Sequence, residues 1–284
     1  MNKKIILFFL ICINAIANAQ YTSVINSNRP GFSESPYAVG KGIYQLETGF
    51  FYINSNTVKT FSIPNTTGFN IVFRTSILSN KLEFNLNTSI QKDKVAFKNI
   101  FTSSYESTGI SELSIGAKYL IYHQEYDDKS KEVRSWKRRN AFDWKRIIPS
   151  VALYLGAHPN LVNDNYKLDG ATYKIGILFQ NNLSRELNII TNFYIDQIGN
   201  SYKEYAYIIT GTMSFSNNWS TFLEHQAKFD TYEINNNIGI GLAYLFSNNL
   251  QIDVSTRLKF NKNSTGVFTG LGFSYRFDRH FAKY

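Results

Sequence analysis

A long alternation of apolar and polar residues near the end of the chain most constrains the fold. From Leu250 to Phe260, apolar residues and threonine alternate with Gln, Asp, Ser, Arg and Lys, and the alternation resumes at Val267 and runs to Phe277. Neighbouring side chains of a β-strand point to opposite faces, so each segment has one apolar and one polar face. The stretch therefore predicts a β-hairpin, which would suit a membrane barrel or a two-sheet sandwich.

The same alternation recurs along the chain and predicts ten further strands. They are expected at residues 42–54, 69–77, 82–90, 109–122, 147–157, 172–180, 187–195, 205–215, 219–229 and 237–246. About ten residues is the length that a tilted strand needs to cross a bilayer. Short turns alternate with longer loops, except for the 123–146 connection, and an even number of strands is typical of bacterial barrels.

The first residues form a targeting segment. Lys3 and Lys4 precede a short apolar run at residues 5–13, and Ala17-Asn18-Ala19 is typical of a signal-peptidase site. Residues 1–19 are therefore predicted to be a signal peptide, and Cys12, the one cysteine of the chain, lies within it. The exported chain then has no cysteine for disulfide or thiol chemistry.

These observations favour an all-β protein, a twelve-stranded antiparallel transmembrane β-barrel in the bacterial outer membrane. No later segment approaches the roughly 20 apolar residues of a membrane-spanning helix, but strands that close into a barrel also satisfy their backbone groups in lipid. The aromatic content of 16% suits the two interfaces of such a barrel. The expected parts are an N-terminal periplasmic segment at 20–41, the barrel at 42–277 with a basic insertion at 123–146, and a tail at 278–284.

Several stretches resemble one family of outer-membrane proteins. Residues 29–36 (RPGFSESP) with 42–47 (GIYQLE), 73–77 (FRTSI), 109–118 (GISELSIGAK) and 249–253 (NLQID) are similar in order to the family described as putative MetA-pathway of phenol degradation. In addition, Gly272-x-x-Tyr275-x-Phe277 resembles the final-strand signal of outer-membrane barrels. The resemblance implies a transporter, and the long insertion at 123–146 departs from the short turn usual in the family.

The polar faces of the expected strands carry most of the candidate site residues. The predicted lumen-lining set consists of Glu47, Arg74, Glu83, Glu112, Lys118, Lys174, Glu224, Lys228, Asp253, Arg257 and Arg276, with Lys259 in the same register. Charged side chains in a lumen either line a selective pore or neutralise one another and hold the barrel shut. If Phe260 pairs with Val267, Asp253 lies opposite Ser274. The final strand is also expected to pair with the first, which would bring Arg276 to Gln45 or Glu47.

The insertion at 123–146 interleaves basic and aromatic residues. Its candidate residues are Arg134, Trp136, Lys137, Arg138, Arg139, Trp144, Lys145 and Arg146, together with Phe142. Such a segment either rests on lipid phosphates with its tryptophans in the interface, or contacts a periplasmic partner, or is a solvated loop. Nucleic acid is not an expected partner of an exported barrel.

The function expected from the sequence is passive passage of a small molecule through the barrel. The four histidines lie far apart, no His-x-x-His or Glu-x-x-His spacing occurs, and no G-x-S-x-G motif is present. An enzyme, a metal and a cofactor are therefore not expected. The expected partners are outer-membrane lipid, the outer-membrane assembly machinery and an unidentified small-molecule permeant. The alternative is a non-conducting structural or surface-binding barrel that would use the loops expected at 56–67 and 92–108.

Overall fold

The computed structural model describes residues 24–57, 62–97, 104–126, 135–136, 142–230, 234–261 and 264–279. The predicted signal peptide at 1–19 lies outside these residues. Within the described ranges, no helix has the length and apolar character needed to cross a membrane.

Twelve strands make up most of the described chain. They are β1 (Ile43–Thr57), β2 (Ser62–Ser79), β3 (Leu82–Phe97), β4 (Ser104–Tyr122), β5 (Ser150–His158), β6 (Thr172–Asn182), β7 (Leu187–Ile198), β8 (Glu204–Ser214), β9 (Trp219–Phe229), β10 (Ile234–Ser247), β11 (Leu250–Phe260) and β12 (Ser264–Asp278). Two short 3-10 helices, η2 (Trp144–Ile147) and η3 (Asp164–Tyr166), flank β5.

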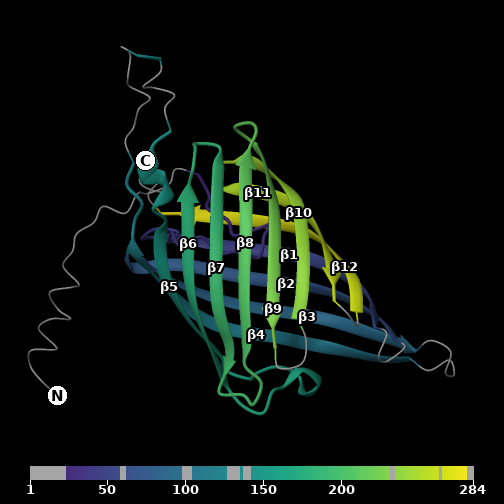
Figure 1. The fold of residues 1–284 in the computed structure, drawn as a ribbon. Helices are drawn as coiled ribbons and strands as arrows, with labels where there is room; N and C mark the ends of the chain where they lie inside the picture. Colours follow the sequence, from purple (N-terminus) through teal and green to yellow (C-terminus); the bar gives the residue numbers. More distant parts are fainter. Residues whose placement is uncertain are drawn as a thin grey trace, which may run out of the picture.

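The strands form one closed antiparallel barrel in which each strand pairs with its sequence neighbours (Figure 1). The barrel closes where β1 pairs with β12, and Gln45 lies opposite Arg276 in that register. Closure leaves neither of these strands with an unpaired edge. The structure thus confirms both the predicted fold class and the predicted seam.

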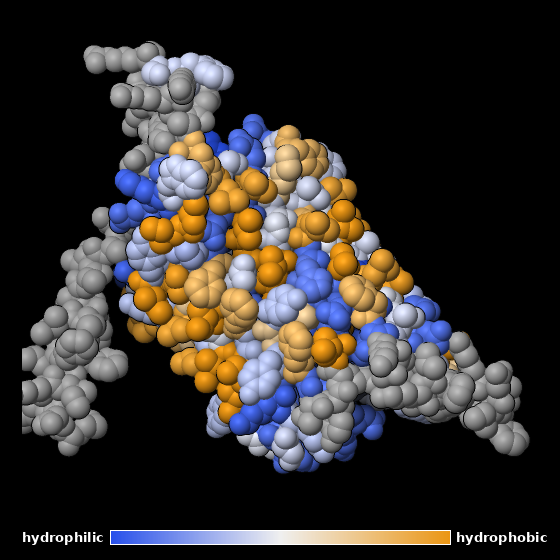
Figure 2. Space-filling view, viewed as in Figure 1, coloured by the Kyte–Doolittle hydropathy of each residue, from blue (hydrophilic) through white to orange (hydrophobic). Residues whose placement is uncertain are grey.

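The two faces of the wall differ as the alternation predicts. On β11, Val254 is exposed and faces outward, whereas its neighbours Asp253 and Ser255 are buried on the inner face. Val254 lies opposite Leu271 of β12, which is also exposed. Apolar side chains cover much of the outer surface in Figure 2. Apolar residues outside and polar residues inside are the reverse of the arrangement in a soluble protein. This arrangement matches a wall that contacts lipid on its outer face and polar groups on its inner face.

Two of the expected loops are largely strand. β1 and β2 extend into the predicted loop 56–67, and β3 and β4 extend into the predicted loop 92–108. The residues there are polar, which suggests a loop, but the strands continue to pair beyond the apolar belt. Lys92 and Glu106, for example, form an ion pair across β3 and β4 with a distance of 2.7 Å between Nζ and Oε2. The prediction of two long binding loops was therefore wrong.

The closing hairpin has a register two residues away from the predicted one. Phe260 lies opposite Thr265, not Val267, because β12 already begins at Ser264 and a backbone hydrogen bond of 2.9 Å from Asn261 to Ser264 closes the turn. As a consequence Asp253 lies opposite Gly272, not opposite Ser274. β12 also ends at Asp278, which the sequence assigned to the tail.

Candidate functional site: the barrel lumen

Residues 24–42, the luminal segment, run through the inside of the barrel. The sequence placed them in the periplasm, but hydrogen bonds join the segment to β1–β7, β9, β11 and β12. Figure 1 shows this part of the chain, in purple, in the space that the strands of the barrel enclose. The physical reason is that the segment offers many unpaired backbone groups and the inner wall offers the charged and amide side chains that bind them.

Four charged side chains of β1–β4 form one buried ionic cluster. Arg74 lies between two carboxylates, with 2.7 Å from Nη1 to Oε1 of Glu47 and 2.8 Å from Nε to Oε1 of Glu83. Lys118 approaches Glu83 from the other side, with Nζ 3.1 Å from Oε1. All four side chains are at most 1% exposed. Because each charge has a partner of opposite sign, the cluster avoids an uncompensated buried charge.

The same cluster holds the luminal segment. Nη1 of Arg74 donates to the carbonyl of Asn26 at 2.8 Å, and Nζ of Lys118 donates to the carbonyl of Ser35 at 2.8 Å. Oε2 of Glu83 accepts a hydrogen bond from the backbone N–H of Val39 at 2.9 Å. The charged side chains are therefore ligands of the segment as well as partners of one another.

Glu224 of β9 is the second attachment point. One of its oxygens, Oε2, accepts hydrogen bonds from the backbone N–H groups of Phe32 at 2.8 Å and Ser33 at 3.2 Å. The other, Oε1, lies 3.3 Å from Nε of Arg257, whose Nη2 donates to the carbonyl of Pro30 at 2.7 Å. A carboxylate that accepts two successive N–H groups fixes the direction of the backbone at this bend.

Arg29 is the third attachment point and comes from the segment itself. Its guanidinium pairs with Asp253 of β11, at 3.1 Å between Nη2 and Oδ1, and donates to Oδ1 of Asn70 at 3.2 Å. Gly49 and Gly272 make room for it, because a Cβ at either position would overlap the guanidinium. These two glycines therefore allow the close approach of Arg29 to the wall, and a side chain at either position would displace the guanidinium.

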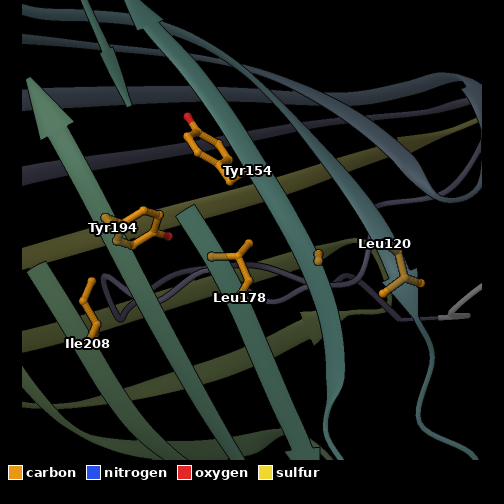
Figure 3. Close-up of a cluster of buried hydrophobic side chains, with 6 residues drawn as sticks. Leu120, Tyr154, Leu178, Tyr194 and Ile208 are labelled. Atoms are coloured by element: carbon orange, nitrogen blue, oxygen red, sulfur yellow. The ribbon is translucent and has the colours of Figure 1, made fainter. Parts of the chain in front are cut away.

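The wall formed by β4–β8 is apolar where the segment packs on it. Its buried cluster consists of Leu120, Ala152, Tyr154, Leu178, Tyr194 and Ile208, five of which are labelled in Figure 3. Tyr37 of the segment packs against this cluster, and its hydroxyl lies 2.7 Å from Oγ of Ser150. The side-chain amide of Asn192 binds both backbone groups of Glu34: Oδ1 accepts from the N–H at 2.7 Å, and Nδ2 donates to the carbonyl at 2.8 Å.

Beyond the luminal segment, toward the connection between β5 and β6, the lumen contains a cavity of about 690 Å³. Tyr166 of η3 lines it and donates a hydrogen bond of 2.7 Å to Asp93. Burial, followed by this hydrogen bond, raises the pKa of Tyr166 above its ordinary value, so the phenol keeps its proton.

The structure places every predicted lumen residue on the inner face but does not unite them in one ring. Lys174 lies 3.9 Å from Asp196, and Lys228 lies 2.9 Å from Glu204, both beside the cavity. Glu112 accepts a hydrogen bond of 3.0 Å from Asn87 on the cavity wall. Arg276 lies apart from these residues, at the β10–β11 turn, where Nε donates to Asn249 at 2.9 Å.

Sequence reasoning missed the contribution of the segment, above all Arg29 and Glu34. One signal was available. The stretch before the first strand has two turn pairs, Pro30-Gly31 and Ser35-Pro36, and the family resemblance begins there at Arg29. A segment that carries family features but no strand pattern is a candidate for a role inside the fold.

The insertion at 123–146 is described only in part. Arg134, Lys137, Arg138 and Arg139 lie outside the described residues. Trp136 and Trp144 are 81% and 75% exposed, and Lys145 lies in η2. Arg146 is attached to the end of β6, since its Nη1 donates to the carbonyl of Asn182 at 2.8 Å. The structure therefore brings the tryptophans to the surface and ties the C-terminal end of the insertion to the barrel rim.

The closed twelve-stranded wall, its apolar outer face and its polar lumen define an outer-membrane β-barrel. The chain belongs to the family described as Putative MetA-pathway of phenol degradation, which matches residues 27–277. The family resemblance found in the sequence is thereby confirmed. The matched range begins within the luminal segment and ends one residue before the end of β12.

Solved structures of outer-membrane barrels share the fold. The COG4313 outer membrane channel from Pseudomonas putida F1 has a TM-score of 0.62 and 8% identity, with 89% of this chain and 100% of that chain covered. The CymD monoaromatic hydrocarbon channel has a TM-score of 0.50 and 9% identity, with 85% and 90% covered. The translocator domain of the autotransporter NalP from Neisseria meningitidis has a TM-score of 0.50 and 10% identity, with 84% and 89% covered. A search of curated protein sequences gives no match.

Proposed function

We propose that this protein is a passive outer-membrane channel for small molecules whose lumen is closed by the luminal segment. The observation that carries the proposal is the cavity of about 690 Å³, which is lined by both polar and apolar side chains and has residues 28–32 and 34 on its wall. A solute that enters the cavity meets the segment before it reaches the opposite end of the barrel. Passage then requires the segment to move away from the wall, without a cofactor or an energy source.

The attachment of the segment supports movement as a unit. Between Asn26 and Val39, the hydrogen bonds that join the segment to described residues of the wall are made to side chains and not to a β-ladder, so this part can leave without breaking the pairing of any strand. Backbone hydrogen bonds to the barrel occur at the two ends of the segment, from Ile25 to Asn248 and from Gly42 to Ser76. The predicted lumen residues thus act in this proposal as the closing contacts, and those beside the cavity, such as Lys174 and Lys228, as its lining.

Transport is favoured over catalysis. The lumen cations Arg74, Lys118 and Arg257 pair with carboxylates and hold backbone groups, which is a structural use of charge. The family and the two similar channels point in the same direction. The proposed location is the outer membrane, with lipid around the barrel and insertion by the outer-membrane assembly machinery, for which β12 supplies the terminal aromatic residues.

A disulfide that locks the segment tests the proposal. Oγ of Ser27 lies 2.9 Å from Oγ of Ser274 on β12, so the double variant Ser27→Cys/Ser274→Cys places two thiols where they can be joined. In planar lipid bilayers, the reduced double variant should conduct as the wild type does, and the oxidised variant should not. If the wild type never conducts, the barrel is a structural or surface-binding protein instead.

Location is tested separately. The protein should fractionate with the outer membrane and migrate faster on gels when it is not heated. Recovery from the soluble periplasmic fraction would contradict the proposed location.

For the insertion we propose contact with the membrane surface. Phe142 packs edge-on against Trp144, at 5.5 Å between ring centroids, and both are exposed beside the rim contact of Arg146. Tryptophan prefers the interface between lipid and water. Brominated lipids should therefore quench Trp144 fluorescence in a variant with Trp136 and Trp219 replaced by Phe, whereas a solvated loop would be quenched by aqueous iodide instead.

A further inference from the structure

One side of the cavity is an aromatic surface. The rings of Phe51 on β1 and Phe268 on β12 are stacked, with centroids 5.8 Å apart and an interplanar angle of 16°. Phe32 of the luminal segment meets Phe268 edge-on at 5.6 Å and is 44% exposed. The Phe51 ring lies against the wall over Gly68, where a Cβ would overlap it. Phe51 and Phe268 are both half-buried and line the cavity, so part of this aromatic surface is open to a ligand inside the lumen. The guanidinium of Arg257 lies over Phe268, at 4.9 Å from the ring centroid.

The neighbouring wall supplies polar groups, and two acceptors there are unused. Asn87 and Glu34 both line the cavity. Oδ1 of Asn87 and Oε2 of Glu34 are buried oxygens that accept no hydrogen bond from any described residue. Because both atoms are acceptors, the group that complements them must be a donor. A hydrocarbon has no such donor, whereas a hydroxyl group does.

The charged groups at the cavity mostly satisfy one another. Lys228 pairs with Glu204 at 2.9 Å, and Arg257 pairs with Glu224 at 3.3 Å. The closest atoms of Lys174 and Asp196 are 3.9 Å apart. Ion pairs of this kind leave little net charge to attract an ionic solute. Lys259 also lines the cavity, so an anionic ligand has to be tested directly.

We infer that the cavity binds a neutral ring compound with several hydroxyl groups, of the size of a mono- or disaccharide. The apolar C–H face of the ring packs on Phe51 and Phe268, and its hydroxyl groups donate to Asn87 and Glu34. A volume of about 690 Å³ is in the range of small-molecule sites, which combine apolar and aromatic lining with a few polar groups. The inference rests on the proposed function in that it names the class of solute for the same lumen.

Calorimetric titration of the purified full-length protein in detergent tests the inference with three probes. Maltose should bind, and neither phenol nor galacturonate should bind as tightly. Phe51→Ala should weaken maltose binding at least tenfold, and Asn87→Leu should weaken it as well. Phe69→Ala, which removes an exposed outward ring of β2, is the matched control and should leave the affinity unchanged. A gel shift on heating shows that each variant is folded.

Tighter binding of phenol, equal or tighter binding of galacturonate, or no binding of maltose overturns the inference. So does maltose binding that Phe51→Ala leaves unchanged. Swelling of proteoliposomes in a maltose solution measures passage of the sugar, and so it tests the proposed function separately from binding. Binding without swelling contradicts passage while the site stands, and swelling with phenol-selective binding contradicts the class of ligand while passage stands.

Discussion

Arg29 and Asp253 lie 224 residues apart in the sequence and form a paired contact inside the barrel, with Nη2–Oδ1 and Nε–Oδ2 distances of 3.1 and 3.3 Å. The Asp253 side chain is fully enclosed, whereas Arg29 is 16% exposed. The pair therefore joins a segment with no strand of its own to the middle of β11. It is one of three charged attachments, beside Glu83 and Glu224, that hold residues 24–42 across the lumen.

Removal of the arginine should loosen the segment without unfolding the barrel. Arg29→Ala leaves the Asp253 carboxylate buried and unpaired, which costs about 3–5 kcal/mol for a pair of this kind. Hydrogen exchange at the backbone N–H groups of Phe32 and Ser33 should then be at least roughly a hundredfold faster. Arg29→Lys keeps the charge and should have a smaller effect. Unchanged exchange in Arg29→Ala would show that this pair does not hold the segment.

Glu83 should be the costliest carboxylate to replace in the lumen. Glu83→Gln removes the charge that Arg74 and Lys118 share, and it should lower the free energy of unfolding by about 3–5 kcal/mol. The control is Glu106→Gln, since Glu106 pairs with Lys92 where both side chains are about half exposed. Exposed pairs contribute little, so the control should unfold in urea like the wild type. Equal shifts in both variants would contradict the assignment of Glu83 to a buried cluster.

The two faces of the wall should respond differently to a new charge. Val254→Arg or Leu271→Arg places arginine in lipid and should cost about 2–4 kcal/mol near the midplane. The inner control is Asn237→Arg, because Asn237 lines the cavity. Ser255, the inner neighbour that the sequence suggests, is unsuitable because it is enclosed beside Arg257. Equal losses for Val254→Arg and Asn237→Arg in urea unfolding would mean that the faces are misassigned.

The end of β12 sets which C-terminal deletion the barrel tolerates. Asp278 is buried and pairs with Ile43 in the seam, so a deletion should begin after it. Removal of residues 279–284 should leave the heat-modifiable gel shift intact. Removal of residues 272–284 should abolish the shift, because β1 would lose its β12 partners along residues 43–49, nearly half of the strand. Loss of the shift in the shorter deletion would show that residues after Asp278 take part in closure.

Period-two alternation predicts the wall well because a one-residue slip would exchange the lipid and lumen faces of a strand. The seam between Gln45 and Arg276 followed from the need to close the barrel. Alternation does not, however, determine how far a strand extends beyond the membrane, and β1–β4 were therefore predicted too short. A register error of two residues keeps every side chain on its own face, so the pattern could not fix the pairing of Phe260.

The sequence predicts which strand residues line the lumen, but it does not predict that the luminal segment occupies it. Glu47, Arg74 and Glu83 lie on the inner face as predicted, because their places in the strands settle their direction. The partners that they take in the luminal segment are backbone groups, such as the N–H of Val39, and every residue carries such groups. No side-chain pattern in the sequence therefore predicts which backbone groups of the segment bind the wall. The path of the segment thus depends on the assembled lumen and could not be derived from local sequence.

The conductance of a protein without the luminal segment tests the central claim most directly. Deletion of residues 24–38 removes Arg29, Glu34 and Tyr37 and keeps all twelve strands. If the segment closes the lumen, single-channel conductance in planar bilayers should rise several-fold over the wild type, and the long-lived closed states of the wild type should vanish. A folded deletion protein, shown by its heat-modifiable gel shift, that conducts no more than the wild type would contradict the account.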